Sequence, residues 1–222
     1  MPRLDNVRKS YARRGRTVEA LRPTTLDIGA GEFVAMVGPS GSGKTTLLSI
    51  VGGMLAPDSG TVWLDGQSLY DLPLGERTRL RRQRIGFVFQ SFNLVSYLTA
   101  VENVQVPLYL AGAAPRQQRR RAVHLLERLS LGERLGHRPA ELSVGQQQRV
   151  ALARTLANDP ALILADEPTG NLDPDMREQV LGLLEEFRRE GRTVVMVTHD
   201  PAAAARADRV LPLIAGEIRA AA

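Results

Sequence analysis

The sequence predicts an α/β fold with a mainly parallel β-sheet, and three observations support this prediction. Short runs rich in Val, Ile, Leu and Phe alternate with segments of helical periodicity through most of the 222 residues. A glycine-rich segment stands directly between one such run and a helical pattern. Residues 92–158 show helical spacing but no convincing strand. Because strands joined by crossover helices form parallel sheets, we expect an α/β core with an inserted α-helical subdomain.

Six apolar runs are the candidate strands of the core. Each is short and contains mainly branched or aromatic side chains, which is typical of strands buried on both faces. They span residues 33–37, 61–66, 85–89, 161–165, 193–198 and 209–214. No linker, repeat or low-complexity tract divides the chain, so we expect a single domain over residues 1–222. Its α/β core would comprise residues 1–91 and 159–222, and its helical subdomain residues 92–158.

Three segments carry the clearest helix signals. Residues 116–129 and 144–157, both in the insert, have helical spacing. A later helix has recognisable ends, because Asp173 is a candidate N-cap, Pro174 suits the first turn and Gly191 ends the pattern. Its apolar stripe consists of Val180, Leu181, Leu184 and Phe187.

The stretch "LSVGQQQRVALARTL", residues 142–156, begins with small and amide side chains and contains no acid. Ser143 followed three residues later by Gln146 is a capping box, which satisfies two backbone amides at a helix start. Taken alone, this pattern favours a structural role for the turn.

The composition is that of an ordinary globular protein, with 43% hydrophobic and 24% charged residues. No apolar run approaches the roughly 18 residues that a membrane span needs, and the first residues lack the apolar region of a secretion signal. We therefore expect a cytoplasmic location. The absence of cysteine excludes disulfides, thiolate metal sites and thiol nucleophiles.

The net charge of +5 raises the possibility of an acidic partner such as nucleic acid or a membrane surface. Two arginine clusters contribute much of it: Arg77, Arg79, Arg81, Arg82 and Arg84, and Arg116, Arg119, Arg120 and Arg121. Both lie in polar, helix-like stretches, which favours solvated helical faces over a binding site.

"GPSGSGKTT", residues 38–46, follows the run 33–37 and matches the P-loop pattern. Glycines without side-chain bulk let backbone amides surround phosphates at a helix N-terminus. Lys44 would bridge the β- and γ-phosphates, and Thr45 would bind Mg²⁺. The predicted phosphate-binding set is Gly38, Ser40, Gly41, Ser42, Gly43, Lys44, Thr45 and Thr46.

Polar residues follow three other candidate strands. Asp166 and Glu167 end a buried run, where carboxylates are costly unless a cation or a reacting water engages them. In a P-loop enzyme, Asp166 would bind Mg²⁺ and Glu167 would polarise the attacking water. His199 and Gln90 also lie beyond strand ends, where ligands of open α/β sheets bind, and we expect His199 to contact the γ-phosphate.

These motifs together resemble the ATP-binding cassette (ABC) transporter family over nearly the whole chain. They occur in the family order: Tyr11, "GPSGSGKTT", Gln90, "LSVGQ", "LILADEP", "NLD" ending at Asp173, and His199. The resemblance implies a P-loop NTPase (RecA-like) core with an additional antiparallel β region and the helical insert. It also implies that Tyr11 stacks on adenine and that Thr45, Gln90 and Asp166 bind Mg²⁺, with catalytic roles for Glu167, His199, Gln90 and Lys44.

The resemblance gives the turn at residue 143 a second role. In this family, Ser143, Gly145 and Gln146 would face the γ-phosphate of ATP bound to a second copy of the subunit. A helix N-terminus suits such an anion, so the capping box and the ATP contact are compatible. This chain departs from the usual family pattern at Val144, which replaces a glycine, but Ser143 and Gly145 are kept, so we expect function to survive.

Among family branches, "SFNLVSYLTAVENVQVPLYLAG" and "DEPTGNLD" are similar to subunits of the lipoprotein-releasing and macrolide-exporter type. The resemblance implies an ATP-dependent homodimer that drives a separate integral membrane permease, docked near the stretch after Gln90. The subunit would then be peripheral on the inner face of the cell membrane.

Two other functions stay open at this point. A cassette ATPase that acts on DNA or the ribosome would suit the basic charge, but such proteins generally resemble two cassettes or a cassette split by a coiled coil. A P-loop kinase or GTPase would leave "LSVGQ" and Asp173 unexplained, and no "NKxD" guanine motif occurs.

Overall fold

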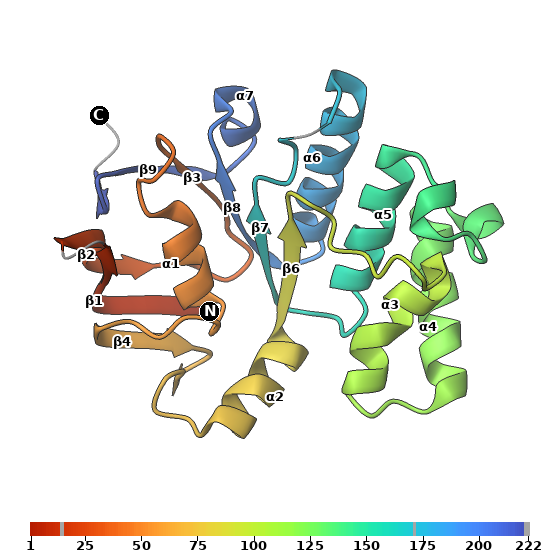
Figure 1. Ribbon diagram of the computed structural model, residues 1–222, viewed down its shortest axis with the longest axis horizontal. Coiled ribbons are helices and arrows are strands. Elements are labelled where there is room, and N and C mark those ends of the chain that lie inside the picture. Colours follow the sequence, from red (N-terminus) through yellow and green to blue (C-terminus); the bar gives the residue numbers. More distant parts are fainter. Residues whose placement is uncertain (14–15, 171, 220–222) are drawn as a thin grey trace.

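The computed structural model describes residues 1–13, 16–170 and 172–219, and contains two β-sheets with helices around them (Figure 1). The larger sheet has the strand order β10-β9-β3-β8-β7-β6, and β9, β3, β8, β7 and β6 run parallel. Its strands are β3 (Phe33–Val37), β6 (Ile85–Phe89), β7 (Leu162–Asp166), β8 (Thr193–Thr198), β9 (Arg209–Ile214) and β10 (Glu217–Ile218). The predicted parallel α/β core is confirmed.

The smaller sheet is antiparallel, with the order β2-β1-β4-β5. Its strands are β1 (Pro2–Arg13), β2 (Arg16–Asp27), β4 (Ser59–Leu64) and β5 (Gln67–Ser68). The predicted run 61–66 therefore lies in this sheet and not in the parallel one. Its alternating burial explains the difference, because Val62 and Leu64 are buried while Trp63 between them is exposed.

Helix α1 (Lys44–Val51) lies between the two sheets, and the remaining helices cover the opposite face of the parallel sheet or its edge (Figure 1). The pleat of β3 shows this division. Val34 and Met36 contribute to the core that includes α1 and the antiparallel sheet. Phe33 and Ala35 contribute to the core that includes the other helices. Alternate residues of β3 thus pack into two different hydrophobic cores.

Residues 92–158 form helices and turns. They comprise α3 (Ala100–Leu110), α4 (Pro115–Arg128), the short 3₁₀ helices Gly132–Arg134 and Pro139–Glu141, and α5 (Val144–Thr155). Buried side chains of α3, α4 and α5 belong to the same core as one face of the parallel sheet. The helical part is therefore continuous with the α/β part through its packing.

Helix α6 (Pro174–Arg189) has the predicted ends and stripe. The Asp173 carboxylate accepts a hydrogen bond from the Met176 amide at 2.9 Å, and Gly191 follows the helix with φ of +89°. The four predicted stripe residues are buried. The remaining helices are α2 (Leu74–Arg84) and α7 (Pro201–Ala204). Within the described residues, no helix is both long enough and apolar enough to cross a membrane.

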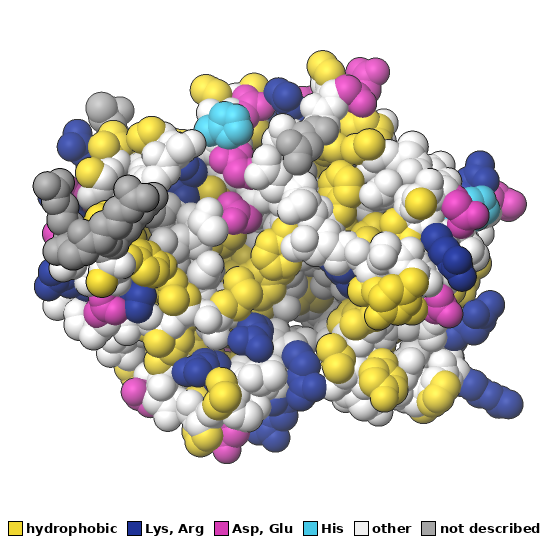
Figure 2. Space-filling model, in the orientation of Figure 1, with side chains coloured by type: hydrophobic (Ala, Val, Ile, Leu, Met, Phe, Trp, Pro, Cys, Tyr) yellow, Lys and Arg dark blue, Asp and Glu magenta, His cyan; other side chains and the backbone are white. Residues whose placement is uncertain are grey.

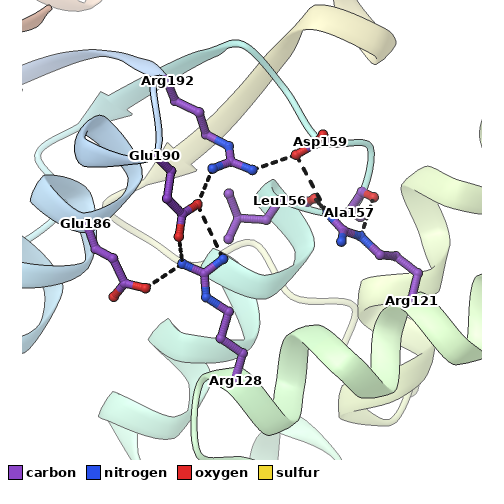
Figure 3. A network of polar contacts seen from close by, with 8 residues as sticks. All are labelled: Arg121, Arg128, Leu156, Ala157, Asp159, Glu186, Glu190 and Arg192. Atoms are coloured by element: carbon purple, nitrogen blue, oxygen red, sulfur yellow. Dashed lines mark hydrogen bonds and ion pairs between the residues drawn. The ribbon is translucent and has the colours of Figure 1, made fainter. Parts of the chain in front are cut away.

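A network of charged side chains fastens α4 to the α/β part (Figure 3). Arg128 of α4 pairs with Glu186, at 2.5 Å, and with Glu190, and its guanidinium lies over the Phe187 ring. Arg192 pairs with Glu190 and with Asp159, which lies 3.8 Å from Arg121 of α4. The network joins α4 to the end of α6 and the start of β8.

Candidate nucleotide-binding site

The predicted P-loop connects β3 to α1 and is held by its neighbours. The Ser42 amide donates to the Pro39 carbonyl at 3.2 Å, and the Gly216 amide donates to the Ser42 carbonyl at 3.0 Å. Gly43 has φ of +104°, and a Cβ there would lie 2.1 Å from the carbonyl oxygen of Ala20 on β2. Only glycine can therefore occupy position 43 without moving the β2 backbone.

Helix α1 begins without a side-chain cap and without an acid in its first turn. Its first amides consequently remain available to an outside acceptor, and the helix dipole favours an anion there. Among the described residues, the buried Ser42 hydroxyl also has no hydrogen-bond partner. Ser40, Gly41 and Thr45 are exposed around the same loop. This donor set fits the phosphates of a nucleotide.

Lys44 is 8% exposed and points back into the loop. Its Nζ donates to the carbonyl oxygens of Gly38 and Pro39, at 2.7 and 3.0 Å. The ammonium group is therefore held among the loop's own backbone, beside the free amides of α1. A cation in this position suits the phosphate role predicted for it.

Thr45 and Asp166 meet at the carboxyl end of β7. The Thr45 hydroxyl lies 3.3 Å from Oδ1 of Asp166. Burial raises the pKa of Asp166, and the neighbouring Glu167 carboxylate raises it further, while Thr45 and Lys44 lower it. A hydroxyl beside a carboxylate whose charge is poorly solvated is a donor set that fits Mg²⁺, which prefers hard oxygen ligands.

Glu167 and His199 are brought together from two neighbouring strands. Oε2 of Glu167 lies 2.9 Å from Nδ1 of His199 and 3.4 Å from its backbone amide. Glu167 has the left-handed φ of +47°, and its amide donates to the Val197 carbonyl at 2.9 Å. The Glu167 side chain is 18% exposed and that of His199 is 67% exposed. The Glu167 carboxylate is therefore the more buried of the two groups, and the His199 imidazole lies nearer to solvent.

Gln90 follows β6 and lies beside the turn that begins at Glu167 and contains Gly170. Its Nε2 is 3.0 Å from the point where a Cβ on Gly170 would stand. A cavity of about 260 Å³ adjoins this place and is lined by Glu167, Thr169, Gly170, Arg177, Thr198, His199, Asp200 and Pro201. Asn171 of the predicted "NLD" motif lies outside the described residues.

Tyr11 lies on the β1–β2 hairpin, opposite Val18. Its ring is 42% exposed, and the ammonium of Lys9 lies 5.9 Å from its centre. The same hairpin approaches the P-loop at Ala20. An exposed aromatic ring near the loop is compatible with the predicted adenine contact, which stays a prediction.

The "LSVGQ" turn has the predicted capping box. The Ser143 hydroxyl accepts from the Gln146 amide at 3.3 Å, and the Gln146 side chain accepts from the Ser143 amide at 3.0 Å. Gly145 is buried, and a Cβ there would lie 1.0 Å from Cε of Met176 on α6. Val144, by contrast, is 53% exposed. Gly145 therefore lets α5 pack closely on α6, while Val144 faces outward.

The turn at Ser143 does not meet the P-loop of its own chain. The N-terminal ends of α1 and α5 open toward the same edge of the molecule, but β7, β8 and α6 lie between them (Figure 1). The structure thus brings together Lys44, Thr45, Asp166, Glu167 and His199, and leaves the Ser143 turn apart from them.

Two contacts that support the site involve residues that were not predicted from the sequence. Nε2 of the buried Gln148 donates to the Pro168 carbonyl at 3.2 Å, which joins α5 to the turn after Glu167. Arg177 pairs with Asp200 at 2.8 Å beside His199. The three consecutive glutamines gave a signal, but only the helical register shows which of them is buried.

Known proteins resemble this chain in sequence and in structure. A family model described as ABC transporter matches residues 21–170. The macrolide export ATP-binding/permease protein MacB 1/2 of Paracoccus denitrificans is 51% identical over 97% of this chain and 32% of its own length. MacB of Brucella melitensis is 48% identical over 97% of this chain and 33% of its own length. The chain thus spans about a third of these relatives.

Two solved structures are similar over almost the whole chain. Both are of MJ0796, one as a dimeric bacterial ABC transporter cassette and the other as a dimeric post-hydrolysis state bound to ADP and Pi. Each has a TM-score of 0.91 and 44% identity, and covers 99% of this chain and 97% of its own. This similarity confirms the predicted cassette fold and favours the transporter interpretation over one on DNA or the ribosome.

Proposed function

This chain belongs to the ABC transporter family of ATP-hydrolysing cassettes, and from that premise we propose that it works as a homodimer that drives a membrane permease of the exporter type. The proposal extends to this chain what the relatives' names and structures say of those proteins. The observation that carries it is the separation of the Ser143 turn from the P-loop on one edge of the molecule (Figure 1).

A two-fold dimer resolves that separation. In a two-fold symmetric interface, a patch on the first copy contacts a different patch on the second copy. By symmetry, the same contact occurs again with the two copies exchanged. The P-loop and the Ser143 turn would then enclose two ATP molecules, each gripped by one copy and covered by its partner. The N-terminus of α5 supplies positive partial charge toward the γ-phosphate, because its dipole points that way.

Within each site, the residues have distinct proposed roles. Lys44 and the first amides of α1 bind phosphate, and Thr45 with Asp166 and Gln90 holds Mg²⁺, which neutralises developing phosphate charge when bound. Glu167 accepts the proton of the attacking water, and His199 orients Glu167 and contacts the γ-phosphate. Tyr11 stacks on the adenine. Loss of the γ-phosphate removes the contact that holds the two copies together.

We further propose that a permease segment docks in the cleft between the α/β part and α3. This cleft has a volume of about 540 Å³ and adjoins the segment after Gln90. Its lining combines apolar residues such as Phe89 with Arg81, Arg82 and Arg154, and no acid occurs among the described residues that line it. Burial lowers the pKa of Arg154, which donates to the Asn93 carbonyl at 2.6 Å. A segment with apolar side chains and a carboxylate fits this lining.

Mixing two inactive variants tests the shared site. Lys44→Ala removes the P-loop lysine, and Ser143→Arg blocks the turn, so each variant alone has no complete site. A mixed pair has one intact site, and random pairing therefore restores at most about a quarter of the wild-type ATPase rate. Rates that stay at the level of either variant alone contradict the shared site. Wild-type mixed with each variant controls for exchange between copies.

A further inference from the structure

The face formed by α2, the end of α3 and the start of α4 concentrates arginines that lack carboxylate partners. We call it the arginine edge, and its arginines are Arg77, Arg79, Arg81, Arg82, Arg116, Arg119 and Arg120. Figure 2 shows dark-blue side chains along the lower margin over α2 and again beside α4. Within residues 1–13, 16–170 and 172–219, none of the seven forms an ion pair.

Many arginines elsewhere in the molecule have carboxylate partners, although within the described residues six others also form no ion pair: Arg3, Arg134, Arg138, Arg149, Arg154 and Arg219. Arg128, Arg188, Arg192 and Arg206 each pair with at least one carboxylate. The arginine edge is therefore distinguished by how many of its unpaired arginines are grouped on two helices.

The two arginine groups of the edge lie on either side of the end of α3. Nη1 of Arg82 donates to the Leu110 carbonyl at the end of α3. Asn158 donates to the carbonyls of Arg82, at 3.0 Å, and Pro107, at 3.2 Å. Only four residues separate the end of α3 from the start of α4. Arg116 in the first turn of α4 therefore follows closely along the chain after Leu110, which Arg82 contacts.

Exposed apolar side chains lie among these arginines. Leu74 at the start of α2 is 69% exposed, Tyr109 is 71% exposed and Leu110 is 53% exposed. Met54, beside Arg81 in the cleft lining, is also exposed. Arginine combined with Leu and Tyr is the composition of surfaces that rest in a membrane interface, where guanidinium groups meet anionic headgroups and amphipathic rings sit at headgroup depth.

A merely solvated helical face accounts less well for the pattern. Helix α2 has no buried residue, and Glu76 is its single acid. Arg77 lies over the Tyr70 ring. Arg81 donates to the Gly53 carbonyl at 3.1 Å, so these two also have contacts within the fold. They stand four residues apart, a spacing at which like charges repel along a helix, and an anionic surface would relieve this repulsion further than water does.

We propose that the arginine edge binds the anionic lipid headgroups of the membrane. The inference goes beyond the proposed function, which explains the cleft but not the arginines outside it. The cleft shares Arg81, Arg82 and Leu110 with the edge, so a permease segment seated there would bring the edge to the headgroup layer. Lipid binding would then hold the cassette in the orientation that the permease requires.

Co-sedimentation of the purified chain with vesicles tests the proposal. Phosphatidylcholine vesicles are compared with vesicles that also contain anionic phosphatidylglycerol, at low and high salt. The edge variant is Arg79→Gln/Arg116→Gln/Arg119→Gln, whose exposed side chains make no hydrogen bond in the described structure. Each basic residue near an anionic surface strengthens binding roughly fivefold, so we expect this variant to bind anionic vesicles about a hundredfold more weakly.

A control variant separates the edge from overall charge. Arg3→Gln/Arg22→Gln/Arg219→Gln removes three exposed arginines from the antiparallel sheet and the end of the chain, and lowers the formal charge equally, from +5 to +2 (5 − 3 = 2). We expect it to retain most of the binding, and the binding of both proteins to weaken with salt. The ATPase rate of the edge variant, expected to be unchanged, reports separately on the proposed function.

Three results would overturn the proposal. Equal losses in the two triple variants would show attraction by net charge alone. Equal binding to both kinds of vesicle would remove the role of anionic headgroups. Tighter, edge-dependent binding to duplex DNA than to anionic vesicles would assign the edge to nucleic acid instead.

Discussion

Oε2 of Glu167 lies 2.9 Å from Nδ1 of His199, so the imidazole and the carboxylate form one unit at the mouth of the site. The left-handed backbone of Glu167 and the bond from its amide to Val197 fix where this carboxylate points. A carboxylate held by both its backbone and a neighbouring ring is suited to orient a water molecule.

Glu167→Gln should reduce ATP hydrolysis by about 10² to 10⁴-fold, because the amide cannot accept the proton of the attacking water. ATP binding should persist, since Lys44 and the α1 amides are untouched. The variant with Mg-ATP should then elute as a dimer in size-exclusion chromatography. His199→Ala should reduce the rate through the orientation of Glu167 and a phosphate contact. A Glu167→Gln protein that hydrolyses ATP normally would show that Glu167 is not the base.

Asp166→Asn should stabilise the protein at neutral pH in magnesium-free buffer without nucleotide. Burial raises the pKa of Asp166 in the folded state above its ordinary value. The stability associated with this group is therefore fully present below the unfolded-state pKa and is lost as pH rises through the raised folded-state pKa. The asparagine variant has no carboxylate to ionise, so it does not lose stability in this way. Its free energy of unfolding should therefore exceed that of the wild type only as the pH rises above the ordinary aspartate range, which lies at about 4.

Thermal unfolding at several pH values, with and without Mg-ATP, measures both effects. Mg-ATP should raise the melting temperature of the wild type and have much less effect on Asp166→Asn, because a cation ligand is gone. Thr45→Val provides a matched comparison, since it removes the partner hydroxyl at 3.3 Å but keeps the carboxylate. An Asp166→Asn curve parallel to that of the wild type across this range contradicts the prediction.

The sequence predicted which residues meet at the candidate site better than it predicted the contacts that hold them there. Glycine spacing and acids at strand ends singled out the P-loop, Asp166 and Glu167 as candidates, because these features depend on local order along the chain. The long β1–β2 hairpin had no predicted range, since its alternating polar residues form no apolar run. The burial of Gly145 against Met176 depends on how two helices cross, which no local pattern contains.

Gly145→Ala should destabilise the fold by about 1 kcal/mol or less, because the added methyl overlaps the flexible end of Met176, which must shift, while the better helix propensity of alanine offsets part of this cost. It should also weaken ATP-dependent dimerisation to the extent that α5 and its Ser143 turn move in place of the Met176 side chain. Met176→Ala in the same chain should restore part of both losses, because the shorter side chain leaves room. Urea unfolding of the two single variants and the double variant measures the coupling. Strictly additive losses would mean that the two residues do not compete for space.

Val144→Gly should lower the free energy of unfolding by less than about 0.5 kcal/mol, because Val144 is exposed and glycine is only slightly poorer than valine as a helix residue. If this turn covers ATP of a second copy, the change should alter the concentration at which Mg-ATP produces dimers in the Glu167→Gln background. Analytical ultracentrifugation at a series of ATP concentrations reads this out. An identical dimerisation curve would place Val144 outside the interface.

Arg128→Met should destabilise the protein by about 1–2 kcal/mol, because it removes the connection of α4 to Glu186 and Glu190 while retaining an apolar stem over Phe187 (Figure 3). Networks of partly buried charges contribute more than isolated surface pairs. Arg189→Met is the matched control, since Arg189 pairs only within α6, with Glu185, and is 66% exposed. Its loss should be about 0.3–0.5 kcal/mol.

Urea unfolding compares the two arginine variants, and hydrogen exchange locates the effect. Arg128→Met should accelerate exchange in α3 and α4 more than in β3 and β8, because it frees the helical part from the end of α6 without altering the sheet. Arg189→Met should leave the exchange of α4 unchanged. Equal destabilisation by both variants, or faster exchange spread evenly over the sheet, would mean that the network does not fasten α4 to the α/β part.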